Sequence, residues 1–232
     1  MSERKLSSRR EAEEFIAKGF IFVNGIKVIH PSTKISRADN IQLRVNKTEP
    51  NKITVILNKP IGYVSSQPEG KHQAAISLIN PYNRSRYDRS KKKFRRTHLR
   101  GLASAGRLDF ESTGLLVFTQ DGVLAKRLIG QDSQVEKEYL VRVKGAVTKD
   151  KLKVLSYGLE LDGIKLKPSV ITQQNESQLK FILREGKKRQ IRRMCSQVEL
   201  RVQELKRVRI GALCLGPLEQ GKWRYLNKFD RF

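Results

Sequence analysis

The apolar residues of this chain occur mainly in short runs separated by turn-forming pairs, and this pattern constrains the fold more than any other feature. Runs such as residues 53–57 and 115–118 have the length of single strands. The pairs Asn24-Gly25 and Asp162-Gly163 each stand between two such runs, where they favour hairpin turns. Strands outnumber helices and do not alternate regularly with them, so the sequence predicts an α+β fold rather than a doubly wound sheet.

The chain divides into two units. Residues 1–46 contain a helix that Ser7 or Ser8 can cap and that Gly19 ends, followed by the Asn24-Gly25 hairpin and a short strand. Residues 47–52 are expected to form a linker, and residues 53–232 are expected to form a larger domain. A chain of 232 residues is long enough for that larger domain to bury a core.

Within the larger domain, residues 67–100 are expected to form an inserted loop. Residues 83–100 contain nine Lys and Arg side chains against a single acid, Asp88. Their few apolar residues show little periodicity. We therefore expect this basic segment to be mobile until its partner binds.

The chain carries a large surplus of positive charge. Its 48 Lys and Arg side chains exceed its 23 Asp and Glu side chains, which gives a formal net charge of +25. Such a surplus implies a polyanionic partner, with nucleic acid first and an anionic membrane second. The membrane is disfavoured because no stretch approaches the roughly 20 consecutive apolar residues of a spanning helix, and the N-terminus has no apolar signal-peptide core. We expect a cytoplasmic protein whose two cysteines, Cys195 and Cys214, are reduced packing residues.

Few residues remain that could carry chemistry. None of the three histidines, His30, His72 and His98, stands at metal-ligand spacing or near a candidate nucleophile, and no glycine-rich phosphate loop is present. What remains is a carboxylate among many cations. Asp109 follows a glycine-started turn just before the apolar run 115–118. In most sequences an aspartate at such a place only caps a turn.

Five motifs, in their order along the chain, resemble those of RNA pseudouridine synthases of the RsuA/RluF group. The first, around Arg9, Arg10 and Asn24-Gly25, is similar to the α-L RNA-binding module first described in ribosomal protein "S-four". The other four are Leu57-Asn58-Lys59-Pro60-Ile61-Gly62, Gly106-Arg107-Leu108-Asp109 with Ser112 and Gly114, Glu136-Lys137-Glu138-Tyr139-Leu140-Val141, and Glu185-Gly186-Lys187 through Arg189-Gln190-Ile191-Arg192-Arg193-Met194. The resemblance covers nearly the whole chain except residues 67–100. It implies an α-L domain followed by a catalytic domain with a mixed, mostly antiparallel sheet.

The resemblance also implies roles for individual residues. Asp109 matches the catalytic aspartate, Tyr139 the tyrosine that stacks on the target base, and Arg192 the arginine that pairs with the aspartate. Arg189 or Arg193 takes that pairing role if the register slips. The expected RNA-binding or pocket-lining residues are Arg107, Leu205, Arg189, Arg193, Lys59, Arg9 and Arg10. Leu205 is as compatible with the general core as with the pocket.

The implied reaction suits this set of residues. Pseudouridine forms when the base–ribose bond is cleaved, the uracil rotates, and carbon 5 is joined to the ribose, so no atoms are lost and neither a metal nor a redox cofactor is expected. One ionised carboxylate can attack the ribose or the base, or take a proton from the sugar, and the sequence leaves these routes open. A guanidinium beside Asp109 would keep it charged, and the base must leave its stack to be reached.

Three functions from different classes fit the composition. The first is an RNA pseudouridine synthase, for which residues 189–195 are most similar to the RluF branch. That similarity implies large-subunit ribosomal RNA as the substrate, with a tRNA or small-subunit RNA as the alternatives. The second is a non-catalytic RNA-binding or ribosome-assembly protein, which would have no need of Asp109, Tyr139 and Arg192 together. A nucleic-acid hydrolase is disfavoured by the missing carboxylate cluster. We expect a monomer.

Overall fold

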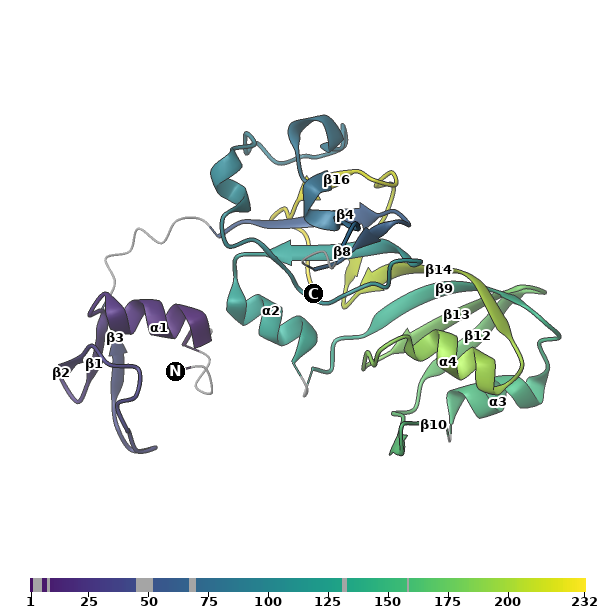
Figure 1. Ribbon diagram of the computed structural model, residues 1–232, viewed down its shortest axis with the longest axis horizontal. Coiled ribbons are helices and arrows are strands. Elements are labelled where there is room, and N and C mark those ends of the chain that lie inside the picture. The colour runs from purple at the N-terminus through teal and green to yellow at the C-terminus, as the bar shows by residue number, and fades with distance from the viewer. Residues whose placement is uncertain (2–5, 8, 45–51, 67–69, 131–132, 158) are drawn as a thin grey trace.

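The computed structural model describes residues 1, 6–7, 9–44, 52–66, 70–130, 133–157 and 159–232 (Figure 1). Within these residues strands outnumber helices, and the α+β class predicted from the sequence is confirmed. None of the described helices is both long enough and apolar enough to cross a bilayer. The expected linker, residues 47–52, lies outside the described residues except for Lys52.

The N-terminal unit combines one helix with a small antiparallel sheet. Helix α1 (Arg9–Ala17) precedes three strands in the order β2-β1-β3, which are β1 (Ile21–Val23), β2 (Ile26–Val28) and β3 (Ile41–Leu43). Asn24 and Gly25 have φ angles of 51° and 83°, the left-handed values that the predicted tight hairpin requires. Gly19, at φ 68°, ends α1 as predicted. The Ser7 hydroxyl forms no hydrogen bond with any described residue, so no cap by Ser7 is found, and Ser8 lies outside the described residues.

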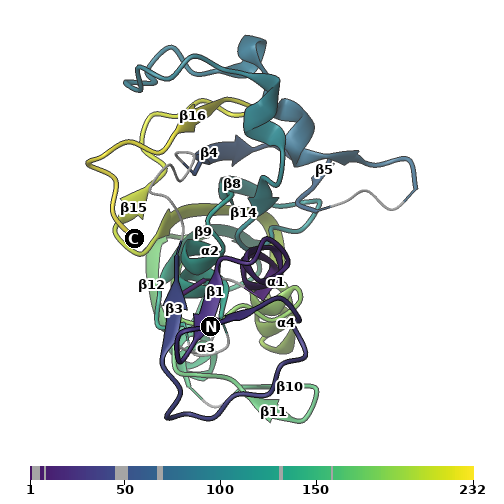
Figure 2. The same ribbon diagram turned by 90° about the vertical axis from the view of Figure 1, so that its left-hand side faces the viewer.

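A nine-stranded sheet forms the centre of the larger domain (Figure 2). Seven strands follow the order β12-β13-β9-β14-β8-β4-β16, while the short strands β15 and β7 pair with β14 and β8, off this order. Every neighbouring pair is antiparallel except β14 and β8, which run parallel. The predicted mixed, mostly antiparallel sheet is therefore confirmed. The strands are β4 (Thr54–Lys59), β7 (Ala103–Ser104), β8 (Thr113–Thr119), β9 (Lys137–Lys144), β12 (Val170–Asn175), β13 (Gln178–Leu183), β14 (Arg201–Ile210), β15 (Leu213–Cys214) and β16 (Trp223–Tyr225).

Two central strands are apolar without alternation because both of their faces are buried. On β8, Leu116 and Phe118 enter the larger core, whereas Leu115 and Val117 enter a second core on the opposite face. Strand β4 divides its side chains between the two cores in the same way. A strand covered on both faces needs apolar residues at every position, which explains the uninterrupted run at 115–118.

Three helices accompany the sheet. They are α2 (Gly122–Ile129), capped by Asp121, α3 (Lys149–Ser156), capped by Thr148, and α4 (Gln190–Gln197). Helix α4 buries Ile191, Met194 and Cys195 in the larger core. Burial raises the pKa of the Cys195 thiol to about 12, as expected of a packing residue. The same expectation was wrong for Cys214, which lies exposed on β15 because the second core is closed by its neighbours Leu213 and Leu215.

Over its described part the inserted segment is folded against the sheet, whereas the sequence led us to expect a loop that stays mobile until its partner binds. Residues 75–99 contain three short 3₁₀ helices, η1 (Ala75–Leu78), η2 (Pro81–Asn83) and η3 (Arg96–Leu99). The segment is ordered because it packs on the edge strand β16, where the Ser85 N–H donates to Trp223 O at 2.8 Å. Two small pairs complete the fold: β5 (Tyr63–Val64) with β6 (Gln73–Ala74), and the predicted hairpin of β10 (Glu160–Leu161) and β11 (Ile164–Lys165).

Candidate active site

A cleft of about 1070 Å³ lies over the central sheet, where β9 pairs with β14. One wall is the turn 104–112 that precedes β8, together with residues 64–66 at the end of β5. The facing wall is the loop 183–189 and the start of α4. The floor is formed by side chains of β9 and β14, where the two strands pair. Asp109, Tyr139, Arg192, Arg107, Arg189 and Leu205 all line this cleft.

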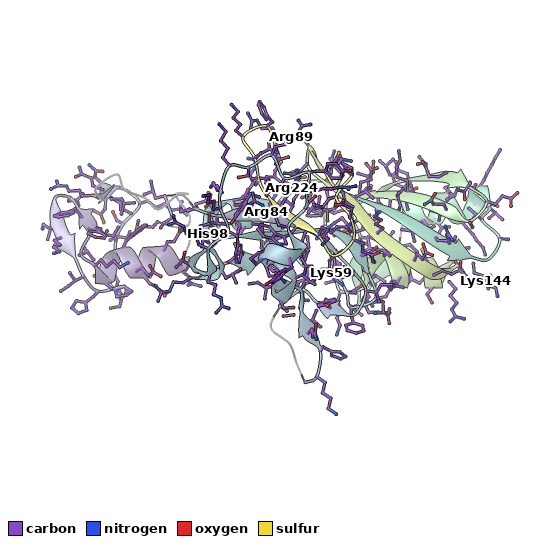
Figure 3. The ribbon with its side chains drawn as sticks, turned by 90° about the horizontal axis from the view of Figure 1, so that it is seen from above. Lys59, Arg84, Arg89, His98, Lys144 and Arg224 are labelled. Atoms are coloured by element: carbon purple, nitrogen blue, oxygen red, sulfur yellow. The ribbon has the colours of Figure 1, made fainter. Side chains whose placement is uncertain are left out.

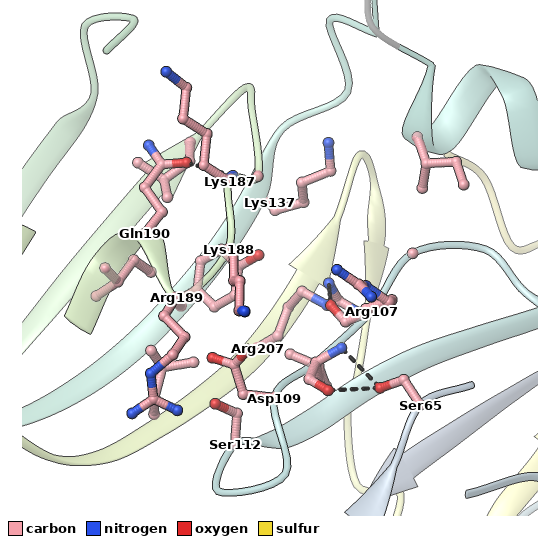
Figure 4. A pocket seen from close by; sticks show the side chains of 18 of the residues that line it. Ser65, Arg107, Asp109, Ser112, Lys137, Lys187, Lys188, Arg189, Gln190 and Arg207 are labelled. Carbon is pink, nitrogen blue, oxygen red and sulfur yellow. Dashed lines mark hydrogen bonds between the residues drawn. The ribbon is translucent and has the colours of Figure 1, made fainter. Parts of the chain in front are cut away.

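The turn that carries Asp109 is fixed by hydrogen bonds to its backbone. Gly106 starts it at φ 97°, a conformation that side-chain-bearing residues avoid. The Ser65 hydroxyl accepts from Leu108 N at 2.8 Å and donates to Leu108 O at 2.7 Å (Figure 4). The Ser112 N–H donates to Asp109 O at 3.0 Å. These bonds fix the backbone of residue 109 while leaving its side chain free.

Arg207 supports the same turn from below. Its side chain, on β14, is 3% exposed. The guanidinium donates from Nε to Leu115 O at 2.8 Å and from Nη1 to Arg107 O at 3.3 Å. A buried guanidinium that bonds two carbonyls of different segments joins β14, β8 and the turn into one unit.

Lys59 is the cation that lies beneath the Asp109 turn. Its side chain at the end of β4 is 0% exposed, and its ammonium group donates to Pro60 O at 2.8 Å and to Phe110 O at 3.4 Å. Burial lowers the pKa of Lys59 to about 8, and the negative charge of Asp109 opposes that shift. Lys59 was expected to contact RNA, but it lies behind the turn and does not line the cleft because β4 ends beneath the turn.

Replacing Lys59 with methionine is expected to remove a pH dependence of stability. Between the folded pKa of about 8 and the unfolded value of 10.5, the unfolded chain holds a proton that the folded chain does not. The unfolding free energy of the wild type should therefore rise with pH across this window, by about 3 kcal/mol from this group. Denaturant unfolding of both proteins at the two ends of the window tests this. A difference between wild type and Lys59→Met that stays constant with pH would contradict it.

Arg192 does not pair with Asp109 in this structure, contrary to expectation. Its Nη2 donates to Glu111 O at 3.2 Å, and its Nε lies 3.7 Å from Glu111 Oε2. Arg189 contacts the same carboxylate at 3.1 Å. The start of α4 contacts the turn at Glu111, two residues after Asp109. The guanidinium groups of Arg189 and Arg192 therefore both lie next to the Glu111 carboxylate. No described residue donates a hydrogen bond to the Asp109 carboxylate or forms an ion pair with it.

Arg193 lies outside the cleft, although the sequence placed it among the binding residues. Its guanidinium forms two hydrogen bonds to the carboxylate of Asp162, in the hairpin of β10 and β11. Successive residues of a helix point about 100° apart, so Arg192 and Arg193 cannot both face the cleft. Arg9 lies exposed on α1, away from the cleft, and the side chain of Arg10 is outside the described residues.

Tyr139 and Leu205 form the apolar part of the cleft floor. Both are buried, and they stand on neighbouring strands, where β9 and β14 pair Tyr139 with Arg207 and Val141 with Leu205. An aromatic ring beside an aliphatic side chain provides a surface on which a flat base can stack. Leu205 also belongs to the larger core, so the pocket and the core explanations both hold for it.

Four buried polar atoms in the cleft have no hydrogen-bond partner within the described part of the chain. They are Ser112 Oγ, Lys187 Nζ, Arg192 Nε and Arg207 Nη2. Three of them carry cationic N–H groups, and buried donors of this kind are costly to leave unbonded. In Figure 4, Lys188 and Arg189 lie across the cleft from Asp109 and Ser112. The cleft is therefore built for a polar, anionic ligand. Among the described residues, no three His, Cys, Asp or Glu side chains are grouped as a metal would require.

The sequence assigned no role to Ser65, Lys137, Lys187, Lys188 or Arg207, which also line the cleft. A role for Lys137 follows from its motif, because it stands two positions before Tyr139 on one strand and so shares its face. Its pKa is lowered by burial and then by the positive charges of Arg207 and Lys167. Ser65 and Arg207 act on backbone atoms far away in the sequence, and no local pattern points to them.

Comparison with known proteins gives a consistent family. Residues 53–197 match the RNA pseudouridylate synthase family, and residues 1–41 match the S4 domain. A crystal structure of a pseudouridylate synthase superimposes with a TM-score of 0.67 at 26% identity, over 95% of this chain and 91% of that one.

Three relatives show how far the similarity extends. An Arabidopsis thaliana protein named "Putative ribosomal large subunit pseudouridine synthase SVR1, chloroplastic" is 34% identical over 96% of this chain, which spans 55% of that protein's length. "Dual-specificity RNA pseudouridine synthase RluF" of Escherichia coli K12 is 29% identical over 98% of this chain and 73% of its own length. An uncharacterised RNA pseudouridine synthase of Aquifex aeolicus is 32% identical over 98% of this chain and 88% of its own length.

Proposed function

The chain belongs to the RNA pseudouridylate synthase family and begins with an S4 domain, and we propose that it isomerises uridine to pseudouridine in folded RNA, with Asp109 as the catalytic carboxylate. The observation that carries this proposal is that the Asp109 carboxylate has no hydrogen bond or ion pair with any described residue. The carboxylate faces a cleft lined by Lys and Arg side chains, yet no described residue bonds it. A carboxylate presented in this way is available to attack the nucleotide or to accept a proton from it.

The floor of the cleft supports the recognition of an extruded base. A uridine inside a helix cannot bring its ribose and base edge to Asp109, so the nucleotide must leave its stack. We assign Tyr139 and Leu205 to hold the uracil ring, since both are buried beside the catalytic turn. The stacking energy gained there offsets part of the cost of unpairing the base.

The reaction needs one pair of bonds exchanged and no external reagent. The bond from uracil N1 to the ribose breaks, the ring rotates, and C5 bonds to the ribose in its place. C5 loses a proton and N1 gains one, so the composition of the nucleotide is unchanged. The three routes open to Asp109 (attack on the ribose, attack on the base, or removal of a sugar proton) all use the same free carboxylate.

The cations of the cleft are proposed to bind the phosphates around the target uridine. Lys187, Arg192 and Arg207 line the cleft, and each has an N–H group that is suited to an RNA oxygen and has no hydrogen-bond partner among the described residues. Arg189 and Arg192 both contact Glu111 and so position the loop after Asp109 as well as facing the RNA. Arg107, exposed at the rim, is assigned to the nucleotides beside the flipped base. In the S4 domain, Arg9 and Arg10 are proposed to add a more distant contact.

Large-subunit ribosomal RNA is the substrate that we propose. This choice of substrate rests on the similarity to a protein named as a ribosomal large subunit pseudouridine synthase. The relative RluF is named as dual-specific, which makes a tRNA the second candidate. Monomeric state and cytoplasmic location stay predictions, which size-exclusion chromatography and cell fractionation can check.

Mapping pseudouridines in total RNA from cells with and without the gene tests this function. We expect at least one site in large-subunit ribosomal RNA to lose its pseudouridine and to regain it when the wild-type gene is restored. Restoring the Asp109→Ala gene should not rescue the site. If every pseudouridine persists in the deletion strain while ribosome assembly is impaired, the alternative of a non-catalytic assembly protein replaces the proposal.

A further inference from the structure

The inserted segment presents a basic surface that lies outside the cleft. None of the residues from 75 to 100 lines the cleft. The segment stands over the β16 edge of the central sheet, where Figure 3 shows Arg84, Arg89, His98 and Arg224 gathered in one region. Nothing in the proposed reaction uses these residues. Their arrangement therefore calls for a separate explanation.

Inward-facing residues anchor the segment to β16. Trp223 Nε1 donates to Asn80 O at 2.7 Å, and His98 Nδ1 lies 2.7 Å from the Tyr225 hydroxyl. The Phe94 ring packs against Trp223, with 5.7 Å between ring centroids. These contacts cover a sheet edge that would otherwise expose unpaired backbone groups.

Arg84 organises the middle of the segment. Its Nε donates to Asp88 Oδ2 at 2.8 Å, and its Nη1 and Nη2 donate to the carbonyls of Lys92 and Ser90 at 2.7 and 2.9 Å. The guanidinium also lies over the Tyr225 ring, 5.1 Å from its centroid. Arg84 therefore neutralises Asp88, the one acid of the segment, and its bonds to the carbonyls of Ser90 and Lys92 hold the backbone there in a compact turn. The remaining cations are left on the outside.

Eight outward cations remain without comparable contacts. They are Arg86, Arg89, Lys91, Lys92, Lys93, Arg95, Arg96 and Arg100, all exposed. Arg86 lies 3.6 Å from Glu219, and no ion pair is found for the other seven among the described residues. The charges of Arg95 and Lys92, after burial, lower the pKa of His98. Covering the sheet edge requires the inward residues only, so it does not account for this concentration of positive charge.

Two exposed tyrosines stand among these cations. Tyr82 is 91% exposed and Tyr87 is 51% exposed, and the Arg86 guanidinium lies 4.8 Å from the Tyr87 ring centroid. An exposed aromatic ring contributes little to folding. Cations interleaved with exposed aromatic rings are typical of surfaces that bind phosphates and stack on unpaired bases. A lipid headgroup surface would use the charges but has no bases to stack on the rings.

We propose that the outward face of residues 82–100 is a second RNA-binding surface, which binds phosphates of the substrate RNA away from the target uridine. This inference rests on the proposed function, because it takes the substrate to be a large folded RNA. Contacts at two separated surfaces raise affinity and fix the orientation of the RNA over the cleft.

The test compares two triple variants that remove the same charge. Lys91→Gln, Lys92→Gln and Lys93→Gln are combined in the insert, with Arg84 and the anchor residues left intact. Lys149→Gln, Lys153→Gln and Lys165→Gln are combined on α3 and β11, which lie outside the cleft and the insert. The binding of an unmodified large-subunit rRNA transcript is measured against salt concentration. For the insert variant, the slope of log affinity against log salt should become shallower by about 2, with affinity about tenfold lower at physiological salt.

Equal slopes for the two variants would overturn the proposal, since only net charge would then matter. A loss of binding to phosphatidylserine vesicles with an unchanged RNA slope would also overturn it, in favour of a membrane surface. Maximal turnover at saturating RNA should be the same for the insert variant and wild type. If wild-type protein forms no pseudouridine but the RNA slope still changes, the proposed function fails and the RNA surface stands.

The tyrosines supply an independent measurement. Tyr82→Ala and Tyr87→Ala remove exposed rings, so the fold should be retained. Each ring that stacks on a base should cost about five- to a hundredfold in affinity for single-stranded RNA, with the salt slope unchanged. Wild-type affinity in both variants would limit the surface to phosphate contacts and overturn the stacking part of the inference.

Discussion

Asp109→Asn is expected to reduce pseudouridine formation by about a thousandfold or more while RNA binding is retained. The amide has nearly the same size as the carboxylate, and the backbone of the turn is held by Ser65 and Ser112 rather than by the Asp109 side chain. What is lost is the negative charge that attacks the nucleotide or takes its proton, an effect of about 10²–10⁴ even for proton transfer alone. Removing a negative charge from a phosphate-binding cleft should leave RNA affinity equal or slightly higher.

The matched control is Glu111→Gln, which removes a carboxylate two residues away on the same turn. Glu111 contacts Arg189 and Arg192, so its loss should loosen α4 from the turn and reduce turnover less than the Asp109 change does. Single-turnover assays with saturating RNA, together with equilibrium binding, separate the two effects. Asp109→Ala excludes a contribution from deamidation of the introduced asparagine. Turnover by Asp109→Ala within tenfold of wild type would remove the central hypothesis.

Gly114→Ala is expected to destabilise the protein by several kcal/mol. Gly114 has a φ of 105°, and an added Cβ would meet the backbone of Arg207 on β14, 2.7 Å from its nitrogen. Neither partner can move easily, because Gly114 pairs with Arg207 on one side and with Lys59 on the other. The cost combines backbone strain with overpacking, which places it at about 3 kcal/mol or more. Any folded fraction should also lose the contact of Arg207 with the catalytic turn.

Gly101→Ala provides the control for strain without a clash. Gly101 has a φ of 66°, and nothing lies within 4 Å of an added Cβ. Its cost should be about 1 kcal/mol, as for an ordinary residue in the left-handed region. Denaturant unfolding of both variants measures the difference. If Gly114→Ala is no less stable than Gly101→Ala, the close approach of β8 and β14 at Gly114 does not limit which residue fits there.

The sequence predicted the local elements of this fold well because their signals are local. The hairpins at Asn24-Gly25 and Asp162-Gly163 depend on neighbouring residues that tolerate positive φ. The doubly buried strand at 115–118 was visible as an unbroken apolar run. The packing of the inserted segment was not predicted, because it depends on contacts with Trp223 and Tyr225, more than a hundred residues away.

For the candidate site, the sequence by itself identified six of the residues that line the cleft, from motifs in a fixed order: Arg107, Asp109, Tyr139, Arg189, Arg192 and Leu205. Only the tertiary structure decided which charged side chains form ion pairs with one another. In the structure, Glu111 pairs with Arg189 and Arg192, and Asp162 pairs with Arg193. Lys59 lies beneath the Asp109 turn and donates to Phe110 O. The physical reason is that an ion pair depends on distances of a few ångströms and on the direction of each side chain. Those are set by how the sheet brings distant segments together, and spacing along the chain does not contain them.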